Sequence, residues 1–143
     1  MARVSRFEVD LALAMRMCVA ATEKASAQGI VVSVAVVDAG GHLIAFQRMD
    51  GAEIAGPVLA PDKAHTAVSH RIGTHELSDL ITPGGDLVGM NAADGGRYIA
   101  FAGGLPLWDG DRVIGGVGVS GGTGEQDLAC AQAAHEVYAR ESG

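Results

Sequence analysis

The chain has few aromatic residues, more negative than positive charge, and no long apolar run. Aromatic residues make up 4% of its 143 residues, so we expect a core of closely packed Ala, Val, Ile and Leu side chains. The formal net charge is −7, which argues against nucleic-acid binding, because phosphate contacts require a basic surface. No apolar run approaches the roughly 20 residues that a membrane-spanning helix needs, so we expect no membrane partner.

Cysteine is also scarce. Cys18 and Cys130 lie among apolar neighbours in helix-like runs and are predicted to be buried free thiols. A disulfide between them stays open as the alternative, although no other feature indicates an oxidising compartment. Residues 1–10 lack the apolar segment of a secretory signal peptide, so we expect a cytoplasmic protein.

Apolar residues and glycine are abundant instead. The chain is 48% hydrophobic and contains 21 glycines. A chain of 143 residues forms one domain, here residues 1–143, and can bury a core without disulfides or metals. Because so much apolar surface is not explained by a membrane span, we expect part of it to be covered in a homo-oligomer.

The order of the predicted elements indicates an α+β fold. Two turn sequences, at residues 39–41 and 109–111, each separate strand-like runs and predict a β-hairpin. Consecutive hairpins favour an antiparallel sheet flanked by helices. The predicted helices are 8–28, about 60–68 with Pro61 in its first turn, 74–80 with Thr74 as N-cap, and 125–140 with Thr123 as cap. The predicted strands are 31–38, 42–50, 98–108 and 112–121, and residues 82–97 form a long loop, which is typical of functional or mobile segments.

Glycines are concentrated between Gly103 and Asp127. Gly115, Gly116 and Gly118 alternate within a predicted strand, which favours close packing of a helix on its backbone. Two glycine pairs flank turns and are predicted to offer backbone N–H groups to an anionic group or a flat ligand edge: Gly103, Gly104, Gly121 and Gly122. Gln126 and Asp127 are predicted to cap the last helix.

Arg48 and Asp50 form the first candidate site. They lie in the sequence RMDG at the end of the second predicted strand. One interpretation is a ligand-binding arginine whose guanidinium is oriented by Asp50, and the other is a structural ion pair that closes the turn.

The second candidate site lies on the middle helix. Lys63, Thr66 and His70 are spaced i, i+3 and i+7, which predicts one helical face, with His65 on another side. These groups can bind a carboxylate and transfer a proton. The alternative is a solvated Lys63 and a His70 that packs against the turn at Gly73. The spacing of His65 and His70 is poor for a shared metal on a regular helix, so no metal site is predicted.

Four sequence segments together resemble a known family. They are VAVVDAGGHLIAFQRMDGA, DKAHTA, GGLPL and GDRVIGGVGVSGGTGEQDLACA. In this order they resemble the GlcG/HbpS-like family, also called the haem-degrading domain family, which includes the C-terminal domain of PduO-type cobalamin adenosyltransferases. The resemblance covers about residues 8 to 138.

The resemblance implies a profilin- or roadblock-like sheet flanked by helices, a homo-oligomer, and a small-molecule pocket that binds haem in some members. Some of these members ligate the iron with a histidine of the first helix. The corresponding helix here contains no histidine and offers the sulfur atoms of Met15, Met17 and Cys18 instead.

The sequence leaves three functions open. The first is a small homo-oligomeric ligand-binding protein, with haem or a related tetrapyrrole as the implied ligand. The second is a cofactor-independent isomerase or lyase for a small organic acid, in which Lys63 and Arg48 hold the carboxylate and His70 or His65 transfers the proton. The third is an accessory subunit whose glycines serve packing alone.

Overall fold

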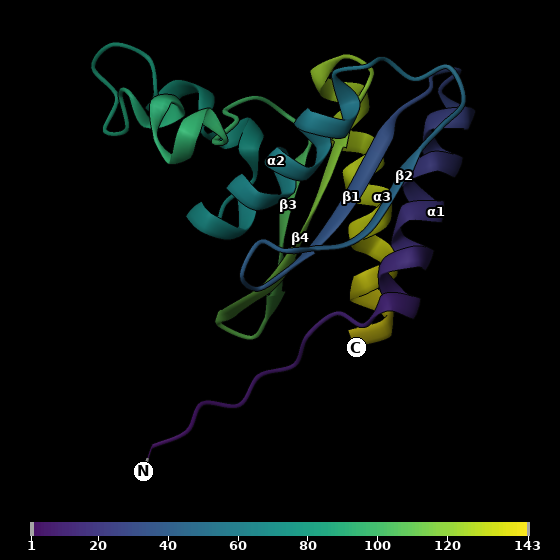
Figure 1. The fold of residues 1–143 in the computed structure, drawn as a ribbon, viewed down its shortest axis with the longest axis horizontal. Helices are drawn as coiled ribbons and strands as arrows, with labels where there is room; N and C mark the ends of the chain where they lie inside the picture. Colours follow the sequence, from purple (N-terminus) through teal and green to yellow (C-terminus); the bar gives the residue numbers. More distant parts are fainter. Residues whose placement is uncertain (1, 143) are drawn as a thin grey trace.

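The computed structural model describes residues 2–142 as three layers around one antiparallel sheet (Figure 1). Helices α1 and α3 cover one face of the sheet and α2 covers the other. The predicted α+β fold, an antiparallel sheet flanked by helices, is therefore confirmed. The elements are α1 (Leu11–Ala27), β1 (Ser33–Asp38), β2 (Leu43–Arg48), α2 (Gly56–His70), β3 (Gly104–Asp109), β4 (Arg112–Ser120) and α3 (Gly124–Ser142).

The sheet has the strand order β2-β1-β4-β3. The two predicted hairpins, β1–β2 and β3–β4, are both present, and β1 and β4 join them in the middle of the sheet. In that central pair Val34 lies opposite Val119 and Val36 opposite Val117, and all four side chains are buried in the main core with α1 and α3. Strands β2 and β3 form the two edges.

The second face of the sheet is kept smooth by the glycines of β4. A Cβ atom at Gly118 would collide with the backbone of Ala60 and Ala64 in α2, and one at Gly116 would come within 2.8 Å of the carbonyl oxygen of Ala64. Because these neighbours are backbone atoms, they cannot move aside cheaply. The predicted close packing of a helix on this strand is confirmed for Gly116 and Gly118, whereas a Cβ at Gly115 would meet the carbonyl oxygen of Val37 in β1.

Helix α2 begins four residues earlier than predicted. It starts at Gly56 with Pro57 in its first turn, and Pro61 lies inside the helix. The predicted start near residue 60 was wrong, because Pro57 already occupies the position that suits a missing N–H group. The helix ends at His70, where Arg71 adopts the left-handed conformation with φ 56°.

Residues 71–103 form an excursion between α2 and β3 that projects from one side of the domain (Figure 1). It contains four short 3₁₀ turns, η1 (Thr74–Glu76), η2 (Ser78–Leu80), η3 (Met90–Ala92) and η4 (Asp94–Gly96). Leu77, Met90 and Ala100 form a small core of its own. The predicted long loop at 82–97 lies within it.

Two predictions for this excursion were wrong. Gly73, not Thr74, is the N-cap of the first short turn, because the hydroxyl of Thr74 instead accepts a hydrogen bond from the N–H of Gly104 at 2.9 Å. Strand β3 begins at Gly104 rather than residue 98. The N–H of Ile99 donates to the hydroxyl of Thr66 on α2, so this part of the chain lies along the helix instead of in the sheet.

Candidate functional site

Lys63 is held in a buried ion pair. Its side chain is 1% exposed, and Nζ lies 3.0 Å from Oδ2 of Asp127 at the start of α3. Nζ also donates to the carbonyl oxygen of Val119 at 2.8 Å and lies 5.0 Å from the centroid of the Phe101 ring. The alternative of a solvated Lys63 was therefore wrong, and the ion pair joins α2, β4 and α3.

Burial lowers the pKa of Lys63 below 10.5, and the charge and hydrogen bond of Asp127 oppose that shift. Oδ1 of Asp127 accepts from the N–H of Gly122 at 2.8 Å, so this carboxylate holds the turn before α3 rather than an N–H group of the helix, and its predicted capping role was wrong. Gln126 and Thr123 complete a capping box, in which each side chain accepts from the other residue's N–H. Sequence reasoning recognised these two caps but missed the ion pair.

Thr66 fastens the excursion to α2. Its hydroxyl donates to the carbonyl oxygen of Asp62 at 2.7 Å and accepts from the N–H of Ile99 at 2.9 Å. The carboxylate of Asp62 in turn accepts from Nε of Arg97 at 3.0 Å. Thr66 is fully buried, so its position supports a structural role in holding residues 97–99.

His65 and His70 both lie against Tyr98 of the excursion. The His65 ring stacks on Tyr98 with centroids 5.7 Å apart, and the His70 ring meets it edge-on at 4.6 Å. Nε2 of His65 lies 2.6 Å from Oδ2 of Asp94, and a Cβ at Gly41 would come within 2.5 Å of Nδ1. Burial, followed by the charge of His65, lowers the pKa of His70 below 6.5. Spacing in the sequence carries no signal for Asp94 or Tyr98.

The three residues predicted to share one face do not meet in one pocket. Lys63 points to Asp127 and Val119, Thr66 points to Ile99, and His70 packs on Tyr98. Intervals of three and seven residues bring side chains near each other on a helix. Here the three side chains have different partners, because the sheet and α3 pack against Lys63 while the excursion packs against Thr66 and His70. Their predicted catalytic roles stay predictions.

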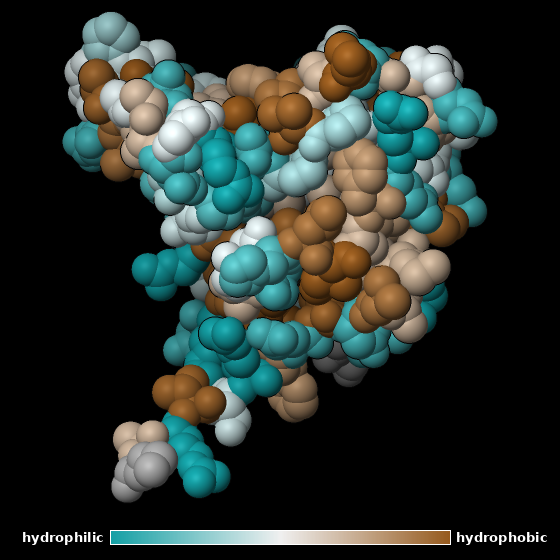
Figure 2. Space-filling model, viewed as in Figure 1, coloured by the Kyte–Doolittle hydropathy of each residue, from teal (hydrophilic) through white to brown (hydrophobic). Residues whose placement is uncertain are grey.

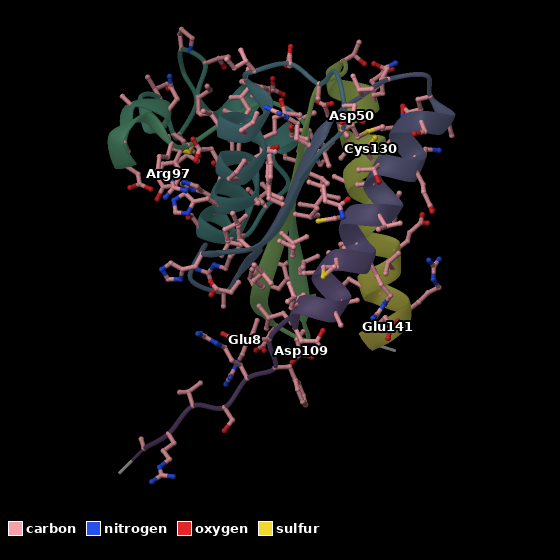
Figure 3. All side chains as sticks on the ribbon, turned by 45° about the vertical axis from the view of Figure 1, so that its right-hand side comes forward. Glu8, Asp50, Arg97, Asp109, Cys130 and Glu141 are labelled. Carbon is pink, nitrogen blue, oxygen red and sulfur yellow. The ribbon has the colours of Figure 1, made fainter. Side chains whose placement is uncertain are left out.

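Arg48 and Asp50 line a groove that includes none of these residues. Both are exposed and belong to an open groove of about 700 Å³ beside Thr22, Glu23 and Ser26 of α1. Among the ion pairs of residues 2–142, none joins Arg48 to Asp50, so the expected orienting contact is absent. Figure 3 shows Asp50 near one end of the helical layer and Arg97 on the opposite side of the molecule.

The glycine pairs predicted to bind a ligand are packed against protein atoms. The N–H of Gly104 is bound by Thr74 and that of Gly122 by Asp127, so neither N–H faces an open site. A Cβ at Gly103 would meet Lys63, and one at Gly121 would come within 2.8 Å of the Cα of Val32. The close approach predicted for these glycines is present, and the neighbour is the protein itself.

The outer face of α1 is apolar. Leu11, Met15 and Val19 are 56%, 50% and 43% exposed, in contrast with Met17 and Cys18, which are fully buried. Ala12, Met15, Arg16 and Val19 line a groove of about 460 Å³. Of the three sulfur-containing side chains on this helix, only the thioether of Met15 reaches the surface.

Comparison with known proteins shows the family. Residues 9–136 match the family described as haem degrading protein HbpS-like. The chain belongs to the HbpS-like family. The predicted resemblance is thereby confirmed over nearly the full length that the sequence indicated.

Three relatives are informative about this HbpS-like chain. The crystal structure of protein ORFY from Klebsiella pneumoniae is 38% identical, covers 97% of both chains and superimposes with a TM-score of 0.92. A crystal structure described as a PduOC:heme complex is 38% identical, covers 92% of this chain and 95% of that one, and has a TM-score of 0.88. The corrinoid adenosyltransferase PduO of Salmonella typhimurium is 44% identical over 80% of this chain, which spans 34% of the length of PduO.

The α1 face of this HbpS-like chain suits a haem group. Haem needs apolar contact for its macrocycle and a nitrogen or sulfur ligand for its iron, and methionine thioethers serve as such ligands in other haem proteins. The groove beside Met15 supplies both.

Within the part of the chain that the structure describes, none of the helices has the length and hydropathy needed to cross a membrane.

Proposed function

We propose that this protein is a small homo-oligomeric ligand-binding protein that takes haem, or a related tetrapyrrole, on the outer face of α1. The observation that carries the proposal is the half-exposed Met15 within an apolar groove on the helix. The haem complex of a relative that is 38% identical supports the same ligand class.

Each part of the groove has a role in the proposal. The thioether of Met15 is the iron ligand, and Ala12 and Val19 contact the macrocycle. Arg16, which pairs with Glu141 at 3.1 Å and is half exposed, is placed to bind a propionate. A bound haem supplies a redox-active iron, and thioether ligation raises its reduction potential.

Titration with hemin tests this proposal. We expect a saturable Soret band for the wild type and a shifted band with at least about tenfold weaker binding for Met15→Leu, which keeps the volume but removes the sulfur. Val19→Ala is the companion variant, since it trims an apolar contact to the macrocycle but leaves the sulfur in place, so its Soret band should keep the wild-type position. Unsaturable absorbance of the wild type would refute haem binding, and an unchanged Met15→Leu spectrum would refute the assignment of the ligand.

Self-association is the second part of the proposal. Apolar atoms gather over β2 on the face shown in Figure 2, and Leu43 of this edge strand is 56% exposed. An edge strand with apolar side chains favours pairing with a second copy. We expect an oligomer in light scattering after size exclusion, and a smaller species for Leu43→Lys but not for Val88→Lys, a control on the excursion with 58% exposure.

The organic-acid enzyme has less support. It requires Arg48 and Lys63 to hold one carboxylate beside His70, whereas Lys63 is buried against Asp127 and Arg48 lies in a separate groove.

A cytoplasmic location remains part of the proposal. It is supported by Cys18 and Cys130, which are both buried free thiols.

A further inference from the structure

A third groove lies along the outer edge of β3, and it shares no lining residue with the groove at Arg48 or with the groove beside Met15. Its volume is about 300 Å³, and it is bounded by the end of α2, the turn η1, strand β3 and the outer face of α3. Five side chains give it its chemistry: Arg71, Glu76, Trp108, Gln132 and His135. Trp108 is the only tryptophan of the chain and is 41% exposed.

Most of the polar groups around this groove are unused. In residues 2–142 the hydrogen bonds and ion pairs include none from the guanidinium of Arg71, the indole N–H of Trp108 or the amide of Gln132. His135 makes an edge contact to the ring of Tyr138, with centroids 6.0 Å apart. Donors and acceptors from three elements therefore converge on one concave surface next to an aromatic ring.

The walls of the groove are firmly connected. The hydroxyl of Tyr138 on α3 donates to the backbone carbonyl of Trp108 on β3 at 2.6 Å, which fixes these two walls relative to each other. Glu76 accepts from the N–H of Gly73 through Oε2 at 3.3 Å, which leaves its other oxygen available. A preformed site of this kind lowers the entropic cost of binding a small ligand.

Arg71 occupies a position that normally favours glycine. Its φ of 56° and ψ of 42° lie in the left-handed region at the end of α2. Glycine or asparagine adopts this conformation at lower cost, so the arginine side chain is the feature that distinguishes this helix end.

We propose that this groove binds a small aromatic carboxylate that carries a hydroxyl group, as in the hydroxybenzoates. The ring stacks on the indole of Trp108, the carboxylate pairs with the guanidinium of Arg71, and the hydroxyl donates to Glu76. This ligand class matches one cation, one anion and one flat ring, and the volume lies at the small end of ligand pockets. Burial lowers the pKa of His135 below 6.5, so its imidazole is neutral at pH 7 and adds no second positive charge.

The single tryptophan gives a direct test. In ¹⁵N-labelled protein without haem, the one indole N–H cross-peak reports on this groove, and 4-hydroxybenzoate is the probe. We expect a saturable shift of that peak, weaker binding of benzoate, which lacks the hydroxyl, and no specific shift with cyclohexanecarboxylate, which lacks the aromatic ring. No saturable shift with 4-hydroxybenzoate, or equal shifts with all three acids, would overturn the proposal.

Variants separate binding from folding. Arg71→Asn keeps the left-handed conformation accessible and removes the charge, so we expect an unchanged melting temperature and at least about tenfold weaker binding. Arg140→Gln, an exposed change on α3 outside the groove, is the matched control and should bind normally. Glu76→Gln should weaken 4-hydroxybenzoate but not benzoate. Normal binding by Arg71→Asn would refute the assignment.

The outcome is independent of the proposed haem site. If the indole peak instead shifts with protein concentration in the absence of ligand, a second copy of the chain covers the groove and the ligand proposal fails. Neither result depends on Met15 or on the Soret band.

Discussion

Replacing Asp127 with asparagine isolates the buried charge pair at the junction of α2, β4 and α3. The asparagine keeps the size of the side chain and an oxygen that can accept from the N–H of Gly122. The change leaves the ammonium of Lys63, 1% exposed, without its counter-charge. Removing one partner of a buried ion pair costs about 3–5 kcal/mol. For a domain of this size that corresponds to a fall of roughly 10–15 °C in the melting temperature.

The measurement is urea unfolding followed by circular dichroism, with two companion variants. Glu141→Gln breaks the half-exposed pair with Arg16 and should cost at most about 1 kcal/mol. The double variant Lys63→Met/Asp127→Asn removes both charges, and we expect it to regain at least half of the stability lost by Asp127→Asn. If Asp127→Asn costs less than about 1 kcal/mol, or if the double variant loses the sum of both single changes, the assignment of a charge pair is wrong.

The pH dependence of the free energy of unfolding tests the same charge pair independently. Burial already holds the pKa of Lys63 below 10.5 in the folded protein, and Asp127 opposes the shift, so Asp127→Asn should lower that pKa further. Between the folded pKa and 10.5 the unfolded chain binds more protons, so the free energy of unfolding rises with pH there. We expect the deficit of Asp127→Asn to shrink as the pH approaches 10. A deficit that is constant or grows would contradict the argument.

Three further predictions concern packing and titration. Gly118→Ala forces a methyl group into the backbone of α2 and should lower the free energy of unfolding by about 2–3 kcal/mol, whereas Gly124→Ala, with an ordinary 3.4 Å contact, should have little effect. Wild type should lose stability as the pH falls below 6.5, because unfolded His70 takes up a proton that the folded state disfavours. His70→Phe should lack that part of the loss, as measured by urea unfolding at pH 5 and pH 7.5, and identical pH profiles would argue against it. Cys18, whose pKa burial raises to about 11, should react with a thiol reagent only on unfolding, so fast labelling of this thiol in the native protein would contradict its burial.

Local chemistry made the hairpins and the helix-on-sheet packing predictable. Turn sequences act over a few residues, so residues 39–41 and 109–111 correctly separated the paired strands. The glycines of β4 correctly predicted that a helix lies on its backbone. Where a strand has no side chains, the backbone of a helix can approach it closely.

Predictions failed where a distant segment competed with a local preference. Residues 98–103 have strand-like composition, yet Thr66 binds the N–H of Ile99 and keeps that stretch on α2. Helical spacing placed Lys63, Thr66 and His70 together, but it carries no information on which elements pack around the helix.

The sequence by itself determined the element order, the antiparallel sheet, the family and the scarcity of aromatic groups. Tertiary structure alone decided which polar side chains are buried, which sulfur atom of α1 reaches the surface, and that Trp108 and Arg71 line one groove. Short-range sterics and hydrogen bonding act along the chain and can be read from neighbouring residues. Burial and pairing depend on contacts such as that between Lys63 and Asp127, which are 64 positions apart and become neighbours only when the three layers close.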